Sequence, residues 1–209
     1  MSEQSVSIIV DEAVTLEGAY SAPRGPALGQ AVILHPHPLY GGSMHNNVVE
    51  ALREGALAAG WGALRFNFRG VGGSGGSHDQ GRGEQDDVAA AARWLAEAHP
   101  GPLALMGYSF GTLVGAAAAA RLPGLAAGVW VAPPLAMGEL APWPPDAGPL
   151  LLIAGDQDEF GRLEALEAYA SGLGARARLL ALEGADHFYW GLESVLERET
   201  AAWLGQAGT

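Results

Sequence analysis

The chain has 209 residues, 49% of them hydrophobic, which is enough for one globular domain with a substantial core. Its formal net charge is −12 and it has no cluster of Lys and Arg, which argues against nucleic acid and anionic membranes as partners. It contains no cysteine, which excludes disulfides, thiolate zinc sites and a thiol nucleophile.

The first segment, Met1 to Val10, lacks the basic stretch and apolar core of a secretory signal, so we expect a cytoplasmic protein. Pro100 to Ala120 carries no charge and is long enough to imitate a membrane span. It is interrupted by Pro102 and several glycines, so we interpret it as a buried strand, a turn and a helix. We therefore predict no membrane association.

Apolar runs alternate with segments of helical period along the chain. The predicted strands are Val6 to Val10, Thr15 to Ala22, Ala31 to Leu34, Ala63 to Phe68, Leu103 to Met106, Val129 to Ala132, Leu150 to Ala154 and Leu179 to Leu182. The predicted helices begin near Ser43, span Glu84 to His99, follow Ser109, and cover about Arg162 to Gly172 and Phe188 to Leu204. This alternation predicts an α/β fold in which helices cover both faces of a mostly parallel sheet.

Only Pro133 to Pro149 departs from this alternation, because its prolines do not favour a long helix. There is room here for a short loop and not for a substantial lid. No repeat or linker divides the chain, so we expect residues 1–209 to form one domain, and the sequence does not indicate an oligomeric state.

Gly107-Tyr108-Ser109-Phe110-Gly111 is a G-x-S-x-G motif, in which glycines allow a sharp turn that exposes the serine between a strand and a helix. A second match surrounds Ser74, but it lies within a glycine-rich loop that has neither flanking element. We therefore predict Ser109 as the nucleophile.

A serine nucleophile needs a histidine base and a carboxylate that orients the histidine. His187 follows the last predicted strand, where a loop can return to the edge of the sheet, and is the predicted base. Asp158 is the preferred acid and Asp156 the alternative, because both follow the strand ending at Ala154. Asp186 is adjacent to His187 in sequence and is interpreted as a turn residue.

The chemistry also needs two amides that bind the developing oxyanion. Phe110 supplies the first by its position after the nucleophile. The second is expected from the loop at His35-Pro36-His37-Pro38, where the amide of His37 is the candidate and those of Leu39 and Tyr40 are alternatives.

The same loop contains an H-x-H pattern, so His35 and His37, together with His45, could alternatively bind a metal. No carboxylate stands nearby in the sequence to complete such a site. We therefore expect these histidines to line the loop and hydrogen-bond its backbone, and we predict neither a metal nor a cofactor.

Five stretches resemble, in order, the small bacterial α/β-hydrolases related to dienelactone hydrolases and to serine aminopeptidase-like hydrolases. They are His35-Pro36-His37-Pro38 with Gly41-Gly42, the run from Arg65 to Ser74, the motif at Ser109, Gly155 to Asp158, and Gly184 to His187. The resemblance implies an α/β-hydrolase fold with about eight strands, and a Ser-Asp-His triad acting without cofactor. It also favours Asp158 over Asp156.

The chain departs from this family at two points. The common His-Gly after the third strand is His35-Pro36 here, which leaves the second oxyanion donor open. A dienelactone hydrolase proper usually has a cysteine nucleophile, so Ser109 argues against that particular activity.

These observations predict a serine hydrolase that cleaves an ester or related acyl bond of a small molecule through an acyl-enzyme. Peptidase, thioesterase and acyltransferase remain alternatives within the same chemistry. A non-catalytic interaction protein with this fold is the alternative from another class. Six aromatic residues are candidates for an apolar pocket or for the core: Trp130, Trp143, Phe160, Phe188, Tyr189 and Trp190.

Overall fold

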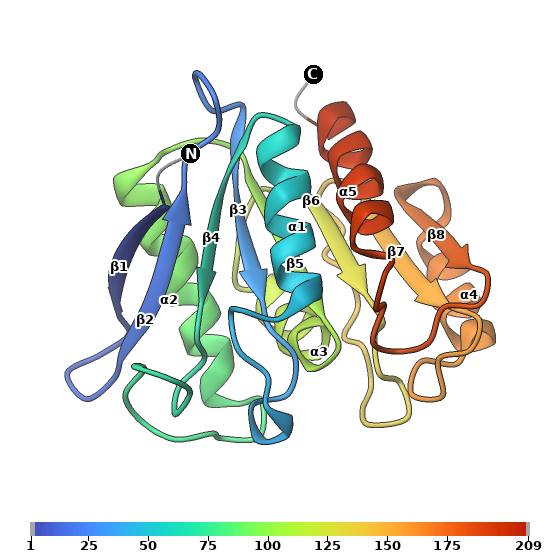
Figure 1. Ribbon diagram of the computed structural model, residues 1–209, viewed down its shortest axis with the longest axis horizontal. Coiled ribbons are helices and arrows are strands. Elements are labelled where there is room, and N and C mark those ends of the chain that lie inside the picture. Colours follow the sequence, from blue (N-terminus) through green and yellow to red (C-terminus); the bar gives the residue numbers. More distant parts are fainter. Residues whose placement is uncertain (1–2, 208–209) are drawn as a thin grey trace.

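A computed structural model describes residues 3–207, which form one eight-stranded sheet covered by helices on both faces (Figure 1). The strands are β1 Glu3–Ile9, β2 Thr15–Ser21, β3 Gly29–Leu34, β4 Trp61–Phe66, β5 Leu103–Tyr108, β6 Leu125–Val131, β7 Leu150–Gly155 and β8 Ala177–Leu182. The α-helices are α1 Asn47–Ala58, α2 Gly83–Ala98, α3 Phe110–Ala119, α4 Leu163–Leu173 and α5 Glu193–Ala207. Two short 3-10 helices, Pro38–Tyr40 and Gly174–Arg176, complete the elements.

The strand order is β1-β2-β4-β3-β5-β6-β7-β8, and β2 runs antiparallel to both of its neighbours. The remaining pairs, from β4 to β8, are parallel. Their carboxyl ends therefore gather at one edge of the sheet, the lower edge in Figure 1. The predicted α/β architecture is confirmed.

Helices α1 and α5 cover one face of the sheet, and α2, α3 and α4 cover the other (Figure 1). Strands β3, β4 and β7 are buried along their whole length; β7 is apolar throughout, whereas β3 and β4 also bury Gln30 and Arg65. Helix α1 turns the predicted face, with Val48 and Leu52 among its buried residues, toward the sheet.

Three predicted boundaries are wrong by four or five residues. Helix α1 begins at Asn47 and not at Ser43, because Asn46 is extended and its side chain accepts the amide of Val48 as an N-cap. Helix α5 begins at Glu193 and not at Phe188, because a turn with positive φ at Tyr189 and Gly191 precedes it.

The third error is in β6, which begins at Leu125 and not at Val129. Its first half, Leu-Ala-Ala-Gly, is built from residues with weak strand preference, and the pairing with β5 shifts register there. Strand β4 also lies two residues earlier than predicted, at Trp61–Phe66, because pairing with β3 begins at Trp61.

Candidate active site

Ser109 lies in the tight turn that joins β5 to α3, at the carboxyl edge of the sheet. Its φ of 53° and ψ of −123° lie in a region that only glycine adopts without strain. The turn also requires a glycine two residues later, because a Cβ on Gly111 would lie 2.6 Å from the carbonyl oxygen of Leu34. The sequence therefore brings α3 directly against β3 and projects the Ser109 side chain outward.

The structure brings together the three residues predicted as a triad. The Oγ of Ser109 is 2.9 Å from Nε2 of His187, and Nδ1 of His187 is 2.8 Å from Oδ2 of Asp158. All three residues are buried. Because the carboxylate of Asp158 accepts a hydrogen bond from Nδ1–H of His187, Nε2 is left as the acceptor that faces the hydroxyl of Ser109.

The two acid candidates have different surroundings. The second oxygen of Asp158, Oδ1, accepts the amides of Phe160 and Gly161 at 2.8 and 3.1 Å, which fixes the carboxylate in its loop. The side chain of Asp156 is exposed and accepts the amide of Gly184, so it joins two loops and does not contact His187.

Asp186 accepts the amide of Phe188 at 2.9 Å, so the predicted turn role is confirmed. Ser74 is likewise part of the scaffold, since its hydroxyl donates to the carbonyl of Asn67 and accepts the amide of Glu17. Neither side chain has a hydrogen bond to Ser109, His187 or Asp158 among the described residues.

Tyr108 is a site residue that the sequence analysis missed. Its hydroxyl donates to the carbonyl oxygen of His187 at 2.8 Å, and the two rings lie 5.6 Å apart. Burial, followed by the nearby charge of Asp158, raises the pKa of Tyr108, so the phenol stays protonated as a donor. The residue precedes the nucleophile at a variable position of the motif, so the motif itself carries no signal for this role.

The candidate oxyanion donors come from two segments of the chain, the start of α3 and the loop after β3. Phe110 is the first residue of α3, where backbone amides have no partner within the helix. His37 lines the same cavity as Ser109, and among the described residues its amide donates to no protein acceptor. The alternatives are engaged within the loop, because Leu39 donates to the ring of His37 and Tyr40 donates to its carbonyl.

His35 connects this loop to the end of β4. Its ring is fully buried, Nε2 accepts the amide of Phe68 at 3.0 Å, and Nδ1 donates to the carbonyl of Pro36 at 2.6 Å. Burial lowers the pKa of His35 to about 4, so the ring is neutral at pH 7. His35 and His37 therefore both hydrogen-bond their own loop, as expected.

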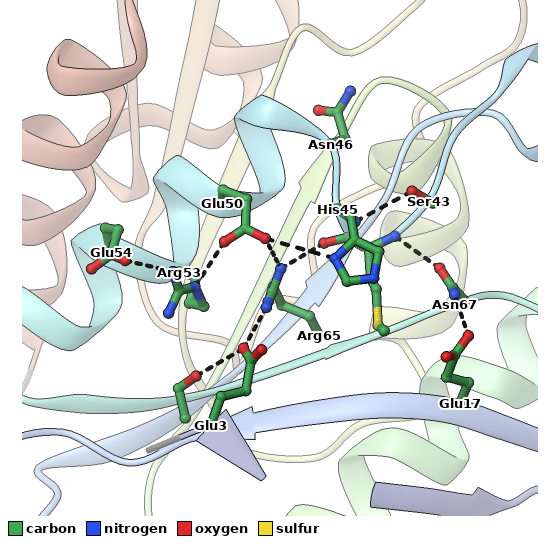
Figure 2. A network of polar contacts seen from close by, with 12 residues as sticks. Glu3, Glu17, Ser43, His45, Asn46, Glu50, Arg53, Glu54, Arg65 and Asn67 are labelled. Atoms are coloured by element: carbon green, nitrogen blue, oxygen red, sulfur yellow. Dashed lines mark hydrogen bonds and ion pairs between the residues drawn. The ribbon is translucent and has the colours of Figure 1, made fainter. Parts of the chain in front are cut away.

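A network of polar residues fixes the far end of the same loop (Figure 2). Arg65 is buried between the carboxylates of Glu3 and Glu50, and its Nη1 donates to the carbonyl of Met44 at 2.8 Å. The amide of Met44 donates to Asn67, so both backbone groups of this residue are held. The run from Arg65 to Ser74 thus anchors the loop that carries His37.

Ser109 opens into a cavity of about 480 Å³, the nucleophile cavity. Phe160 and Phe188 stand at its rim beside His187, and Tyr40 stands beside His37. The other predicted aromatic residues do not reach it: Trp130, Trp143 and Tyr189 are core residues, and Trp190 is exposed at the surface. The connection from β6 to β7 supplies Met137 to the rim and has no helix of its own.

The residues from 3 to 207 contain no group of three or more His, Asp and Glu side chains arranged to hold a metal ion. His45, the third candidate for a metal, is exposed, with its Nδ1 4.0 Å from Glu50. Among the described helices, none has the length and apolarity that crossing a membrane requires.

The sequence profile of the alpha/beta hydrolase fold matches residues 32–178. The chain belongs to the α/β-hydrolase family. This α/β-hydrolase is 33% identical over 187 residues to an uncharacterised protein of Rickettsia prowazekii. The match covers 83% of this chain and 77% of that protein.

Two solved structures are similar to this α/β-hydrolase over nearly their whole length. The first, an α/β serine hydrolase without lid from Xanthomonas campestris, has a TM-score of 0.86 at 31% identity, with 97% of this chain and 95% of that chain covered. The second, an α/β serine hydrolase homologue from Coxiella burnetii, has a TM-score of 0.85 at 32% identity, with 98% of each chain covered.

Proposed function

We propose that this protein is a serine hydrolase that cleaves an ester or a related acyl bond of a small molecule, in the cytoplasm and as one domain. Ser109 acts as nucleophile, His187 as base and Asp158 as orienting acid. The observation that carries the proposal is the continuous hydrogen-bond chain from Ser109 Oγ through His187 to Asp158, at 2.9 and 2.8 Å, beside an open cavity. The similar serine hydrolases support the same chemistry.

In the first step, Ser109 Oγ bonds to the substrate carbonyl carbon while its proton passes to Nε2 of His187. The carbonyl oxygen becomes an oxyanion held by the amides of Phe110 and His37. As the intermediate collapses, the bond to the leaving oxygen breaks, and that oxygen takes the proton from His187. Water, deprotonated by His187, then attacks the acyl carbon, and the bond to Ser109 Oγ breaks as Oγ takes the proton from His187, which releases the acid and free Ser109.

The proposal is tested by intact-mass analysis after treatment with a fluorophosphonate, which phosphonylates an activated serine without requiring the natural substrate. We expect one adduct on the wild-type protein and none on Ser109→Ala. Alanine also has a Cβ, so the control has the same backbone strain at this position as the wild-type serine. With p-nitrophenyl acetate, Ser109→Ala is expected to lower kcat by on the order of 10⁶.

The absence of an adduct on folded wild-type protein would contradict the proposal and favour a non-catalytic interaction protein. If the adduct forms, parallel assays with esters, thioesters and peptides distinguish an esterase from a thioesterase or peptidase. Transfer of the acyl group to an added alcohol in preference to water would instead indicate an acyltransferase.

A further inference from the structure

A second cavity, of about 360 Å³, lies on the α3 side of the nucleophile, and the mechanism above does not use it. Its floor is one face of α3, made by Phe110, Leu113, Val114 and Ala117, which have the spacing i, i+3, i+4 and i+7. We call it the α3 cavity. It lies beside the nucleophile cavity, since His37 and Met137 line both cavities and Phe110 directly follows Ser109.

The walls of the α3 cavity are largely apolar. The ring of Phe110 lies 4.7 Å from that of His37 and 5.6 Å from that of His78, so three rings form a continuous surface. Burial, followed by the nearby His78, lowers the pKa of His37, which keeps its ring uncharged at neutral pH.

Two of the polar residues that line the cavity, Arg82 and Gln85, have partners within the protein. Arg82 pairs with Asp79 at 3.0 Å, and the side-chain amide of Gln85 donates to the carbonyl of Gly81 at 2.8 Å. The cation of this lining, Arg82, is paired with Asp79, and the face made by α3 suits an uncharged apolar group.

The wall formed by residues 78–82 is held by a buried carboxylate. Glu84 is fully buried, accepts the amides of Asp79 and Gly81 at 2.8 Å each, and has Oε1 2.8 Å from Nδ1 of His78. Because this wall is fixed by the protein itself, the cavity exists before any ligand arrives.

In the proposed mechanism the leaving alcohol and the acyl group of the substrate lie near different residues, and these residues line different cavities. The leaving oxygen must take its proton from His187, which lines the nucleophile cavity with Phe160 and Phe188 and does not line the α3 cavity. The α3 cavity is bounded instead by His37 and Phe110, whose amides are the proposed oxyanion donors.

We propose that the α3 cavity binds the acyl group of the substrate, and that this group is uncharged, apolar and larger than acetyl. The inference rests on the proposed hydrolase function and assigns the leaving alcohol to the Phe160 and Phe188 side. At about 30 Å³ for a water-sized group, the cavity has room for on the order of ten such groups. A medium-length acyl chain or an arylpropanoyl group has this size.

The test compares p-nitrophenyl acetate, butyrate and octanoate, which share one leaving group, on wild type and on Ala117→Leu. Ala117 lies one turn beyond Leu113 and Val114, so a leucine there fills the part of the α3 cavity that is farther along the helix from Ser109. We expect the ratio of kcat/KM for octanoate to that for acetate to fall about tenfold. The matched control is Ala120→Leu, an exposed position at the end of the same helix that does not line the cavity, and its ratio is expected to equal that of wild type.

A second variant, Leu113→Ala, enlarges the cavity and is expected to raise the same ratio, which keeps the proposal testable if Ala117→Leu does not fold. Unchanged ratios in the folded variants would overturn it. So would a variant that changes selectivity between ethyl and octyl acetate, which differ only in the alcohol. Fluorophosphonate labelling of wild type reports separately on Ser109, so failure of the proposed function and failure of the acyl assignment give different results.

Discussion

Asp158 and Asp156 are separated by one residue, yet only Asp158 meets His187, because its other oxygen is fixed by two loop amides. The carboxylate charge is needed to hold the imidazole in the tautomer that accepts the proton of Ser109. Asp158→Asn should therefore lower kcat for p-nitrophenyl acetate by roughly 10⁴.

The matched control for this prediction is Asp156→Asn, which removes an exposed charge that touches Gly184 and leaves the triad intact. Its kcat should stay close to that of wild type. Loss of activity in Asp156→Asn together with an active Asp158→Asn would reverse the assignment of the acid.

His35 gives the folded protein a sensitivity to acid. Its pKa is about 4 in the folded state, whereas an unfolded histidine titrates near its usual 6.5. Between these two values the unfolded chain binds a proton that the folded chain does not, so the free energy of unfolding falls as the pH falls from 6.5 to 4. The contribution of this residue is on the order of 3 kcal/mol.

The variant His35→Gln offers Phe68 an amide oxygen in place of Nε2 and does not titrate. Urea unfolding measured from pH 7 to pH 4 should show that wild type loses more stability over this range than His35→Gln. Equal losses in the two proteins would mean that His35 is protonated in the folded state over the same range as in the unfolded chain.

Sequence patterns identify residues whose role depends on local conformation. Ser109 can be predicted because flanking glycines mark the turn, and His187 because it follows the last strand. Tyr108 and Met44 could not be predicted, because their roles depend on contacts with residues 79 and 21 positions away. Such contacts exist only once the sheet has assembled.

At the scale of elements, the approach of α3 to the sheet depends on glycine at its first turn. A Cβ on Gly111 would also lie 2.8 Å from the carbonyl oxygen of His35, so both close contacts are with backbone, which cannot rotate away. Gly111→Ala should therefore destabilise the protein by about 1–3 kcal/mol and displace Ser109 from His187.

Gly172, in the last turn of α4, is the matched control, because its missing Cβ would meet open space. Gly172→Ala should be neutral or stabilising by up to about 1 kcal/mol, since alanine is the better helix former. Urea unfolding and fluorophosphonate labelling of both variants measure the two effects. A Gly111→Ala protein as stable and as reactive as wild type would show that α3 can move away from β3 freely.

The order of the elements follows from hydrophobic periodicity, which depends on neighbours in sequence. Their ends follow from capping and turns. Asn46 and Tyr189 set the beginnings of α1 and α5 through a side-chain cap and a positive φ, and neither feature interrupts the apolar pattern from which the helices were predicted.

At the scale of the whole molecule, the net charge of −12 acts on any charged substrate before it reaches the site. Anionic esters should be repelled, and salt should screen the repulsion over roughly 10 Å at 0.1 M. We expect kcat/KM for a succinyl monoester to rise with ionic strength, and kcat/KM for the uncharged butyryl ester to change little. A fall with salt for the succinyl ester would indicate a local positive field at the site.

The cavities could not be predicted from the sequence. The α3 cavity is formed by His37, the segment 78–82, one face of α3 and Met137, which come together only in the assembled molecule. Composition predicted one globular domain and argued against nucleic acid and anionic membranes as partners. It could not show that the apolar space around Ser109 has two parts.

The backbone conformation of Ser109 also limits the free energy of unfolding that this molecule can reach. A non-glycine residue held at such a φ and ψ costs on the order of 1–3 kcal/mol, a sizeable fraction of the 5–15 kcal/mol that separates folded from unfolded domains. Glycine is the residue best suited to that position, and a glycine there has no hydroxyl. Selection for thermal endurance alone would thus favour glycine at this position and remove the proposed nucleophile.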